Sequence, residues 1–170
     1  MVKIFQKEAL VLRNIAKDVP IDNITSAKIQ KILNDMKKAL DSQDDGVAIA
    51  APQIGQGLRI FTVSPKIKKF SLDKEDKKDN LVYINPILTK ISKEKSLVEE
   101  GCLSVRYLYG KVLRATRATV EAYDEKGKKF RRGASGILAQ VFQHEIDHLN
   151  GILFVDKATN IENIPPPKIK

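Results

Sequence analysis

The chain has 170 residues and a formal net charge of +9, with 42% hydrophobic and 30% charged residues. Such a length can bury one sizeable core but not two, so we expect a single domain over residues 1–170. The composition is that of a globular protein rather than a disordered one, and no apolar run is long enough to cross a membrane.

The start of the chain and its cysteine content bear on the cellular compartment. Residues 1–5 lack the long apolar segment of a secretory signal. The chain has one cysteine, which has no partner for an intramolecular disulfide and agrees with a reducing environment. We therefore expect a cytoplasmic protein.

The positive charge has two interpretations. Much of the lysine and arginine excess lies in residues 66–69 and 126–132, and aromatic residues make up only 6% of the chain. Solvated loops account for such charge runs, and a nucleic-acid-binding patch is the alternative. Salt-sensitive RNA affinity would support that alternative.

The first predicted element is an amphipathic helix. Residues 22–26 offer several possible N-caps, after which apolar residues recur at helical spacing. We expect these side chains to pack on the core: Ile29, Ile32, Leu33, Met36 and Leu40. The following segment, residues 47–53, consists mainly of small residues, which permit another backbone to approach closely.

Two strands separated by a charged segment are expected next. Residues 58–63 have the composition of a strand, and residues 81–84 form an apolar strand that Asn85 and Pro86 should stop. Residues 66–80 are charged and aperiodic, which predicts an exposed loop or hairpin.

The last part of the chain predicts a hairpin, a buried helix and a tail. Residues 119–123 alternate in polarity and lead through a turn into residues 128–132. A helix should begin after Ser135 as N-cap and stop near Gly151, and its two apolar faces indicate that it is buried. Residues 165–170 begin with three prolines and predict a flexible tail.

The second half of this helix contains His-Glu-Ile-Asp-His at residues 144–148. His144 and His148 are i, i+4 neighbours, so both imidazoles project from one face and can bind the same metal ion, with Glu145 beside them to handle protons. These are the only histidines in the chain, and Cys102 is the only cysteine. Two imidazoles and a thiolate would leave a fourth metal position open, as in catalytic sites. The alternative is a polar helix face and a small buried cysteine.

Three motifs resemble the peptide deformylase family, in the family's order and at roughly its spacing. They are Gly-Val-Ala-Ile-Ala-Ala-Pro-Gln at residues 46–53, Glu-Gly-Cys-Leu-Ser at residues 100–104, and the segment at residues 144–148. The resemblance extends from about Leu10 to Asp156. It implies a catalytic domain of α+β class, in which small antiparallel sheets pack around a central buried metal-binding helix.

The resemblance also implies a reaction, a cofactor and partners. The family's enzymes are metal-dependent hydrolases that remove the formyl group from the N-terminal N-formylmethionine of newly synthesised polypeptides. One divalent ion would be held by Cys102, His144 and His148: Fe2+ natively, with Zn2+, Ni2+ or Co2+ possible in a preparation. The partners would be N-formylmethionyl peptides of nascent chains, with a possible transient ribosome contact and neither DNA nor a membrane. The sequence itself shows no transit peptide, which favours a bacterial-type cytoplasmic location over an organelle.

Roles for individual residues follow from the same resemblance. Glu145 would be the general base, while the side-chain amide of Gln53 and the N–H of Leu103 would form the oxyanion hole. The main chain at Val47 and Ala48 would pair with the substrate as an added strand. Apolar side chains would form the methionine pocket: Val47, Val98, Ile137 and Val141.

Two further charged residues each have two interpretations. Glu100 either orients the metal ligands or is merely an edge-strand carboxylate. Arg114 falls where the family has an arginine that can pair with the aspartate at Asp147, although any single arginine is commonly a surface cation.

The chain departs from the family pattern at two positions. Ala48 replaces the usual second glycine, and Arg106, followed by Tyr107, stands where proline is common. One extra methyl would narrow the cleft, and Arg106 should alter its rim. These departures motivate an alternative, a catalytically weakened deformylase-like protein that binds N-terminal peptides; a metalloprotease is the other alternative.

Overall fold

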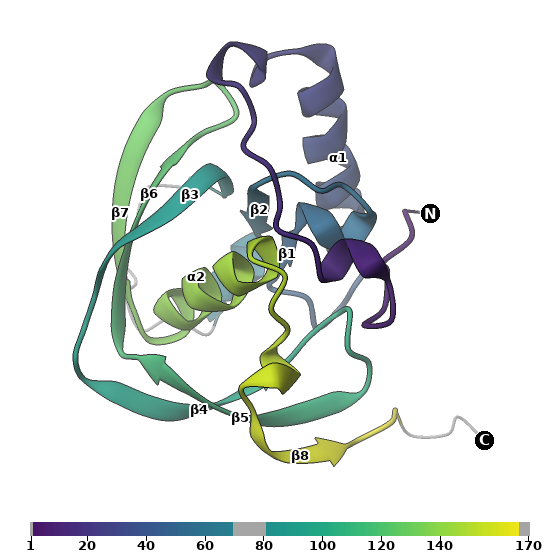
Figure 1. Cartoon of the computed structure of the whole chain (residues 1–170), viewed down its shortest axis with the longest axis vertical. Coiled ribbons are helices and arrows are strands. Elements are labelled where there is room, and N and C mark those ends of the chain that lie inside the picture. Colours follow the sequence, from purple (N-terminus) through teal and green to yellow (C-terminus); the bar gives the residue numbers. More distant parts are fainter. Residues whose placement is uncertain (1, 70–80, 167–170) are drawn as a thin grey trace.

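The structure is a computed structural model that describes residues 2–69 and 81–166. It has an α+β fold, with helices α1 (Ala27–Asp41) and α2 (Gly136–Leu149) on opposite faces of a five-stranded antiparallel sheet (Figure 1). Across this sheet the strands are β1 (Ala48–Ala50), β2 (Ile60–Val63), β3 (Val82–Ile91), β6 (Arg117–Tyr123) and β7 (Lys129–Ser135).

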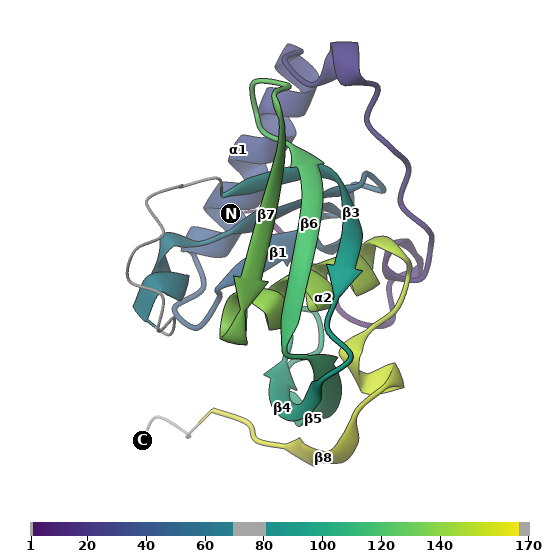
Figure 2. The same cartoon turned by 90° about the vertical axis from the view of Figure 1, so that its left-hand side faces the viewer.

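A second, three-stranded antiparallel sheet lies below α2 in Figures 1 and 2. Its order is β4 (Lys95–Gly101), β5 (Leu108–Ala115) and β8 (Thr159–Asn163). In the described part of the chain, short 3-10 helices occupy five places: Leu10–Leu12, Ile21–Asn23, Ala51–Ile54, Pro65–Lys69 and Phe154–Asp156. Within residues 2–69 and 81–166, neither α-helix is long and apolar enough to cross a bilayer.

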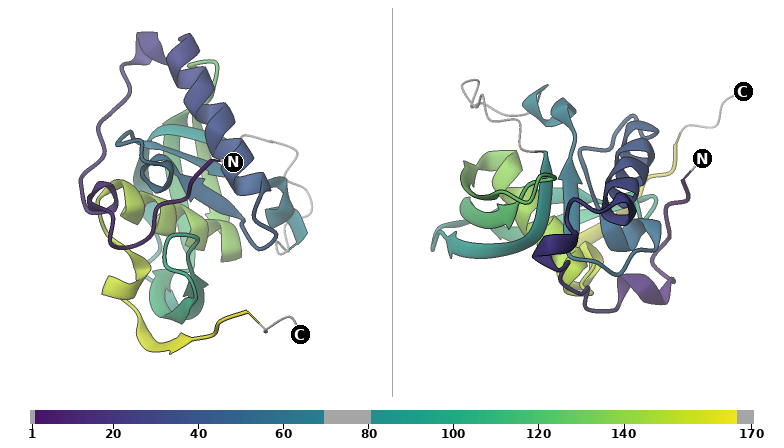
Figure 3. Two further views of the ribbon diagram at one scale, coloured as in Figure 1. Left: turned by 90° about the vertical axis from the view of Figure 1, so that its right-hand side faces the viewer. Right: turned by 90° about the horizontal axis from the view of Figure 1, so that it is seen from above.

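The predicted N-terminal helix is confirmed as α1. Ser26 is its N-cap, and the Ser26 hydroxyl accepts a hydrogen bond from the Ile29 N–H at 3.4 Å. The five apolar residues of the predicted stripe are all buried, and Met36 is completely inaccessible to solvent. Figure 3 shows α1 crossing the sheet on the side away from α2.

The alternation of side chains along each strand explains how one sheet packs against a helix on each face. Successive residues of a strand point to opposite faces, so Phe61 and Tyr83 pack with α2, while Ile60 and Ile84 pack with α1. The Phe61 and Tyr83 rings stack with their centroids 4.4 Å apart. The sheet is therefore apolar on both faces here, and α2 is buried as its sequence predicted.

The prediction that Asn85 and Pro86 end a strand is wrong, because β3 continues through them to Ile91. The chain passes this point by means of a register irregularity in the pairing with β6 and a positive φ of 50° at Asn85. The Asn85 side chain also accepts from the Val19 N–H and donates to the Val19 carbonyl, both at 2.8 Å.

Two further segments differ from the sequence-based expectations. The predicted loop at residues 66–80 starts inside the 3-10 helix Pro65–Lys69, where Ile67 is buried, and its residues 70–80 lie outside the described part of the chain. Residues 167–170 of the predicted tail also lie outside it. β8 has no counterpart among the sequence predictions, since all five of its residues are exposed and it has no buried face to produce a pattern.

Gly151, which follows the C-cap residue of α2, provides a stability test with an internal control. Gly151 and Gly127 have similar positive φ values of 74° and 79°. A Cβ on Gly151 would lie 2.5 Å from the Arg13 carbonyl oxygen, whereas a Cβ on Gly127 would meet nothing within 4 Å.

We expect Gly127→Ala to lower the free energy of unfolding by about 1 kcal/mol and Gly151→Ala by a further 1–3 kcal/mol or so, the usual cost of overpacking. Denaturant unfolding of the metal-free variants measures both. Equal losses would show that the contact with Arg13 does not constrain the end of α2.

Candidate active site

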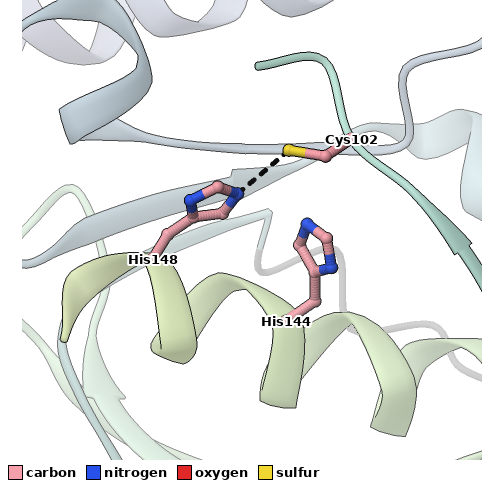
Figure 4. Close-up of side chains that lie close together, drawn as sticks. All are labelled: Cys102, His144 and His148. Carbon is pink, nitrogen blue, oxygen red and sulfur yellow. Dashed lines mark hydrogen bonds between the residues drawn. The ribbon is translucent and has the colours of Figure 1, made fainter. Parts of the chain in front are cut away.

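Three possible metal ligands meet between α2 and the end of β4. Cys102 directly follows β4, and His144 and His148 lie on successive turns of α2 with both rings directed toward the cysteine (Figure 4). One ligand atom from each residue lies within 4.8 Å of the others, and the Cys102 Sγ is 3.2 Å from the His148 Nε2. The structure thus brings together the two histidines and the cysteine that the sequence singled out.

The chemistry of this donor set fits a transition-metal ion. The Nδ1 of His144 lies 2.9 Å from the Glu100 Oε2, which leaves the His144 Nε2 for a ligand. His148 presents its Nε2 to the sulfur. A sulfur and two imidazole nitrogens can hold zinc or iron, and a set of three protein ligands leaves a position for water or substrate.

Glu145 lies beside the two histidines in an environment that raises its pKa. The residue is 4% exposed, and its Oε2 has no hydrogen-bond partner among the described residues. Burial disfavours the charged carboxylate and raises the pKa of Glu145 to about 7. Glu145 also lines the cleft that reaches His144.

A buried ion network orients His144 from behind. Glu100 accepts hydrogen bonds from the Arg114 Nε at 2.8 Å and from its Nη2 at 3.0 Å, while the Arg114 Nη1 donates to the Asp147 Oδ2 at 2.6 Å. The side chains of Arg114 and Glu100 are only 5% and 2% exposed. Lys157 donates to both oxygens of Asp147, at 2.7 and 2.8 Å.

This network determines the charge state of Glu100. Burial alone would raise its pKa, but hydrogen bonds from His144 and Arg114 outweigh burial and lower the pKa to about 2. Glu100 is therefore a buried carboxylate held between a guanidinium and a metal-ligand candidate, not a solvated edge-strand residue.

The cleft in front of these residues has a volume of about 260 Å³. One side is formed by the segment around β1 and another by the turn after Cys102, and α2 contributes Ile137, Val141 and His144. Val47 and Ala48 line this cleft as predicted. Val98 does not, because it lies farther back on β4, paired with Val112; sequence reasoning also overlooked Gln140 and Tyr109, which do line it.

Gln53 is held so that its amide nitrogen faces the metal-ligand group. The residue is 1% exposed, and its Oε1 accepts from the Ala50 N–H at 2.8 Å. This leaves the Nε2 to donate to the Ser104 hydroxyl at 3.0 Å and toward the Cys102 sulfur at 3.6 Å. Among the described residues, the Leu103 N–H makes no hydrogen bond.

The N-terminal segment braces both sides of the cleft. The Phe5 N–H donates to the Gln53 carbonyl at 2.8 Å, and the Gln6 side chain donates to the Leu103 carbonyl at 3.0 Å. No motif marks Gln6, and its part in the site follows only from the tertiary structure. The N-terminal segment therefore holds Gln53 and the turn after Cys102 through one common support.

Most of the chain matches the model of one protein family. The family model for polypeptide deformylase matches residues 1–163. This chain belongs to the polypeptide deformylase family. A peptide deformylase of Halothermothrix orenii is 42% identical over 151 residues, which cover 89% of each chain. Peptide deformylase 1A, chloroplastic/mitochondrial, of Arabidopsis thaliana is 41% identical over 155 residues, which cover 86% of this chain and 57% of the relative.

Solved deformylase structures share the fold. The peptide deformylase of Legionella pneumophila matches with a TM-score of 0.79 and 38% identity, covering 94% of this chain and 87% of that chain. The enzyme of Synechococcus elongatus in complex with actinonin matches with a TM-score of 0.79 and 32% identity, covering 94% and 79%. This chain is accordingly an enzyme of the deformylase class, and nothing favours peptide binding without hydrolysis.

Arg114 tests whether the buried network stabilises the fold around α2. We expect Arg114→Met to lower the free energy of unfolding of the metal-free protein by about 3–5 kcal/mol, because it leaves Glu100 and Asp147 without their buried cation. Urea unfolding followed by circular dichroism measures the loss.

Arg13→Met is the matched control. Arg13 also makes two hydrogen bonds to one carboxylate, that of Asp156, but the two side chains are 43% and 37% exposed. Its loss should cost no more than about 1 kcal/mol. A similar cost for both variants would contradict the structural role given to the buried network.

Proposed function

We propose that this enzyme removes the formyl group from the N-terminal formylmethionine of new polypeptides, with the reaction taking place at the cleft between β1, α2 and the turn after Cys102. The observation that supports this proposal is that three different kinds of chemical group lie together in this cleft. A possible metal triad, the buried Glu145 carboxyl group and the Gln53 amide all meet at one end of the cleft.

Cys102, His144 and His148 are proposed to hold one divalent ion, with ferrous iron as the native metal. When bound, such an ion polarises a carbonyl oxygen and lowers the pKa of coordinated water. The protein's contribution is to present the thiolate and two imidazoles together, with Glu100 holding His144 in the orientation that frees its Nε2.

Glu145 is proposed to move the proton. It would accept a proton from the attacking water and later deliver it to the departing amine of methionine, so that formate and a free N-terminus result. Its place beside the histidines on α2 and at the wall of the cleft suits this role. Its burial keeps bulk water away from the transferred proton.

Gln53 and Leu103 are proposed to stabilise the negative charge that develops on the formyl oxygen. Their donors, the Nε2 of Gln53 and the N–H of Leu103, belong to the two sides of the cleft that flank Cys102. The hydrogen bond from the Ala50 N–H fixes the amide of Gln53 before substrate arrives. Removing one such donor commonly lowers the rate by ~10²–10³.

The free edge of β1 is proposed to bind the peptide backbone. β1 pairs with β2 on one side only, and Val47 and Ala48 line the cleft on its other side. An extended peptide could add to this edge as a further strand. Val47, Ile137 and Val141 would then surround the methionine side chain with apolar groups.

The partners follow from the reaction. Nascent chains that carry formylmethionine are the proposed substrates, encountered in a bacterial-type cytoplasm where they emerge from the ribosome. A transient electrostatic contact with ribosomal RNA is compatible with the net charge of +9. Such attraction would weaken as salt is added.

The proposal is tested by anaerobic formate release from formyl-Met-Ala-Ser with iron- or nickel-loaded protein. We expect Glu145→Gln to lower kcat by ~10²–10⁴, since the proton acceptor is lost. Metal content measured on the same samples separates a catalytic defect from loss of the ion.

Glu99→Gln is the matched control because Glu99 also lines the cleft but is exposed and is not proposed to react. It should retain most of the activity. No release by folded, metal-loaded wild type would overturn the proposed function, and full activity in Glu145→Gln would remove Glu145 from the mechanism.

A further inference from the structure

Arg106 and Asp45 form an ion pair that joins the two sides of the cleft. The Arg106 Nη1 donates to the Asp45 Oδ2 at 2.6 Å, and its Nη2 donates to the Asp45 Oδ1 at 3.1 Å and to the Gln43 Oε1 at 2.8 Å. The Arg106 and Asp45 side chains are 24% and 56% exposed. Both oxygens of Asp45 thus face one guanidinium in a bidentate arrangement.

The two residues come from the segments that flank the substrate cleft. Asp45 lies in the turn that leads from α1 to Val47, and Arg106 lies four residues after Cys102. Both line the same cleft as His144 and Glu145. Gly46 brings these segments close together, because a Cβ at this position would lie 3.3 Å from the Leu103 Cδ1.

Along one wall of the cleft, β1 separates Asp45 from the amide of Gln53. From Asp45 the chain runs through Val47 and β1 to Gln53, whose amide is 3.6 Å from the Cys102 sulfur. A peptide whose methionine pairs with Val47 and Ala48 would continue toward Asp45. At about 3.3 Å per residue, its third residue would come near the ion pair.

We propose that the Arg106–Asp45 ion pair determines charge specificity at the third residue of the substrate. This inference rests on the proposed deformylase function and on the β1 binding mode. While the pair is intact, each charge is neutralised by its partner, so a substrate carboxylate or ammonium has no unpaired opposite charge to bind. The enzyme therefore accepts acidic and basic third residues about equally.

Breaking the pair from either side should produce opposite preferences. Asp45→Asn leaves the Arg106 guanidinium available for an acidic third residue. Arg106→Gln leaves the Asp45 carboxylate available for a basic one. The second effect should be smaller, because Lys66 also places positive charge near Asp45.

The experiment measures kcat/KM for formyl-Met-Ala-X-Ser amides in which X is Asp, Ser or Lys. Wild type should give an Asp-to-Lys ratio near one. We expect Asp45→Asn to raise this ratio roughly two- to fivefold, which is the fold-change that a partly exposed ion pair can produce. Arg106→Gln should lower the ratio by a smaller factor. The double variant should return toward one, and added salt should reduce the single-variant shifts.

Lys31→Gln and Asp35→Asn are the matched controls, since they remove the same charges from an exposed i, i+4 pair on α1. They should keep the wild-type ratio. Unchanged ratios in the cleft variants, or shifts of both in the same direction, would overturn the inference. The peptide in which X is Ser tests the proposed deformylase function separately from the charge preference. If wild type fails to deformylate this peptide, the proposed function itself is wrong.

Discussion

The buried carboxylate of Glu100 is the constraint on which the site depends. A charge with so little access to water must be paired, and three elements meet in order to pair it: β4 supplies Glu100, β5 supplies Arg114 and α2 supplies His144 and Asp147. The same hydrogen bonds that satisfy Glu100 set the orientation of the His144 ring. One network therefore pairs the buried charge of Glu100 and orients His144, a residue that could bind a metal ion. This explains why α2 carries polar residues although it lies between two sheets.

The cleft depends on a different property, the small size of the residues on its walls. Gly46 permits the turn before β1 to approach Leu103, and the alanines of β1 allow α2 to pack close to the sheet. Ala48 is 8% exposed and belongs to the same core cluster as the buried residues of α2. It also lines the cleft. Its extra methyl is thus accommodated at the boundary between core and cleft. The free edge of β1 remains beside the possible metal site, where an extended peptide could bind.

Sequence patterns predicted the elements whose evidence is local. Helical periodicity predicted α1 and α2, and the i, i+4 spacing placed both histidines on one face of α2. Alternating polarity and turn residues also predicted β2 and the β6–β7 hairpin. Two features that depend on tertiary contacts were not predicted. β3 continues beyond Asn85 because a register irregularity and contacts with Val19 compensate for the turn-forming residues, and the fully exposed β8 has no alternation that marks it.

The same distinction applies within the site. Cys102 and the histidines could be chosen because the chain contains no other residues of their kind. The contacts of Gln6 with Leu103 and of Arg106 with Asp45 join residues that are far apart in sequence, and composition says nothing of such pairs. In the sequence, Arg106 is only a departure from a family pattern, whereas in the structure its side chain pairs with Asp45 and Gln43.

The most direct test of the account is the optical spectrum of the cobalt-substituted protein, recorded anaerobically beside Cys102→Ser. If Cys102, His144 and His148 together hold the ion, the spectrum will show a thiolate-to-cobalt charge-transfer band and the intense d–d bands of a four-coordinate site, and the charge-transfer band will be lost in the variant. A six-coordinate spectrum without a thiolate band, from wild-type protein that still releases formate, would contradict the account.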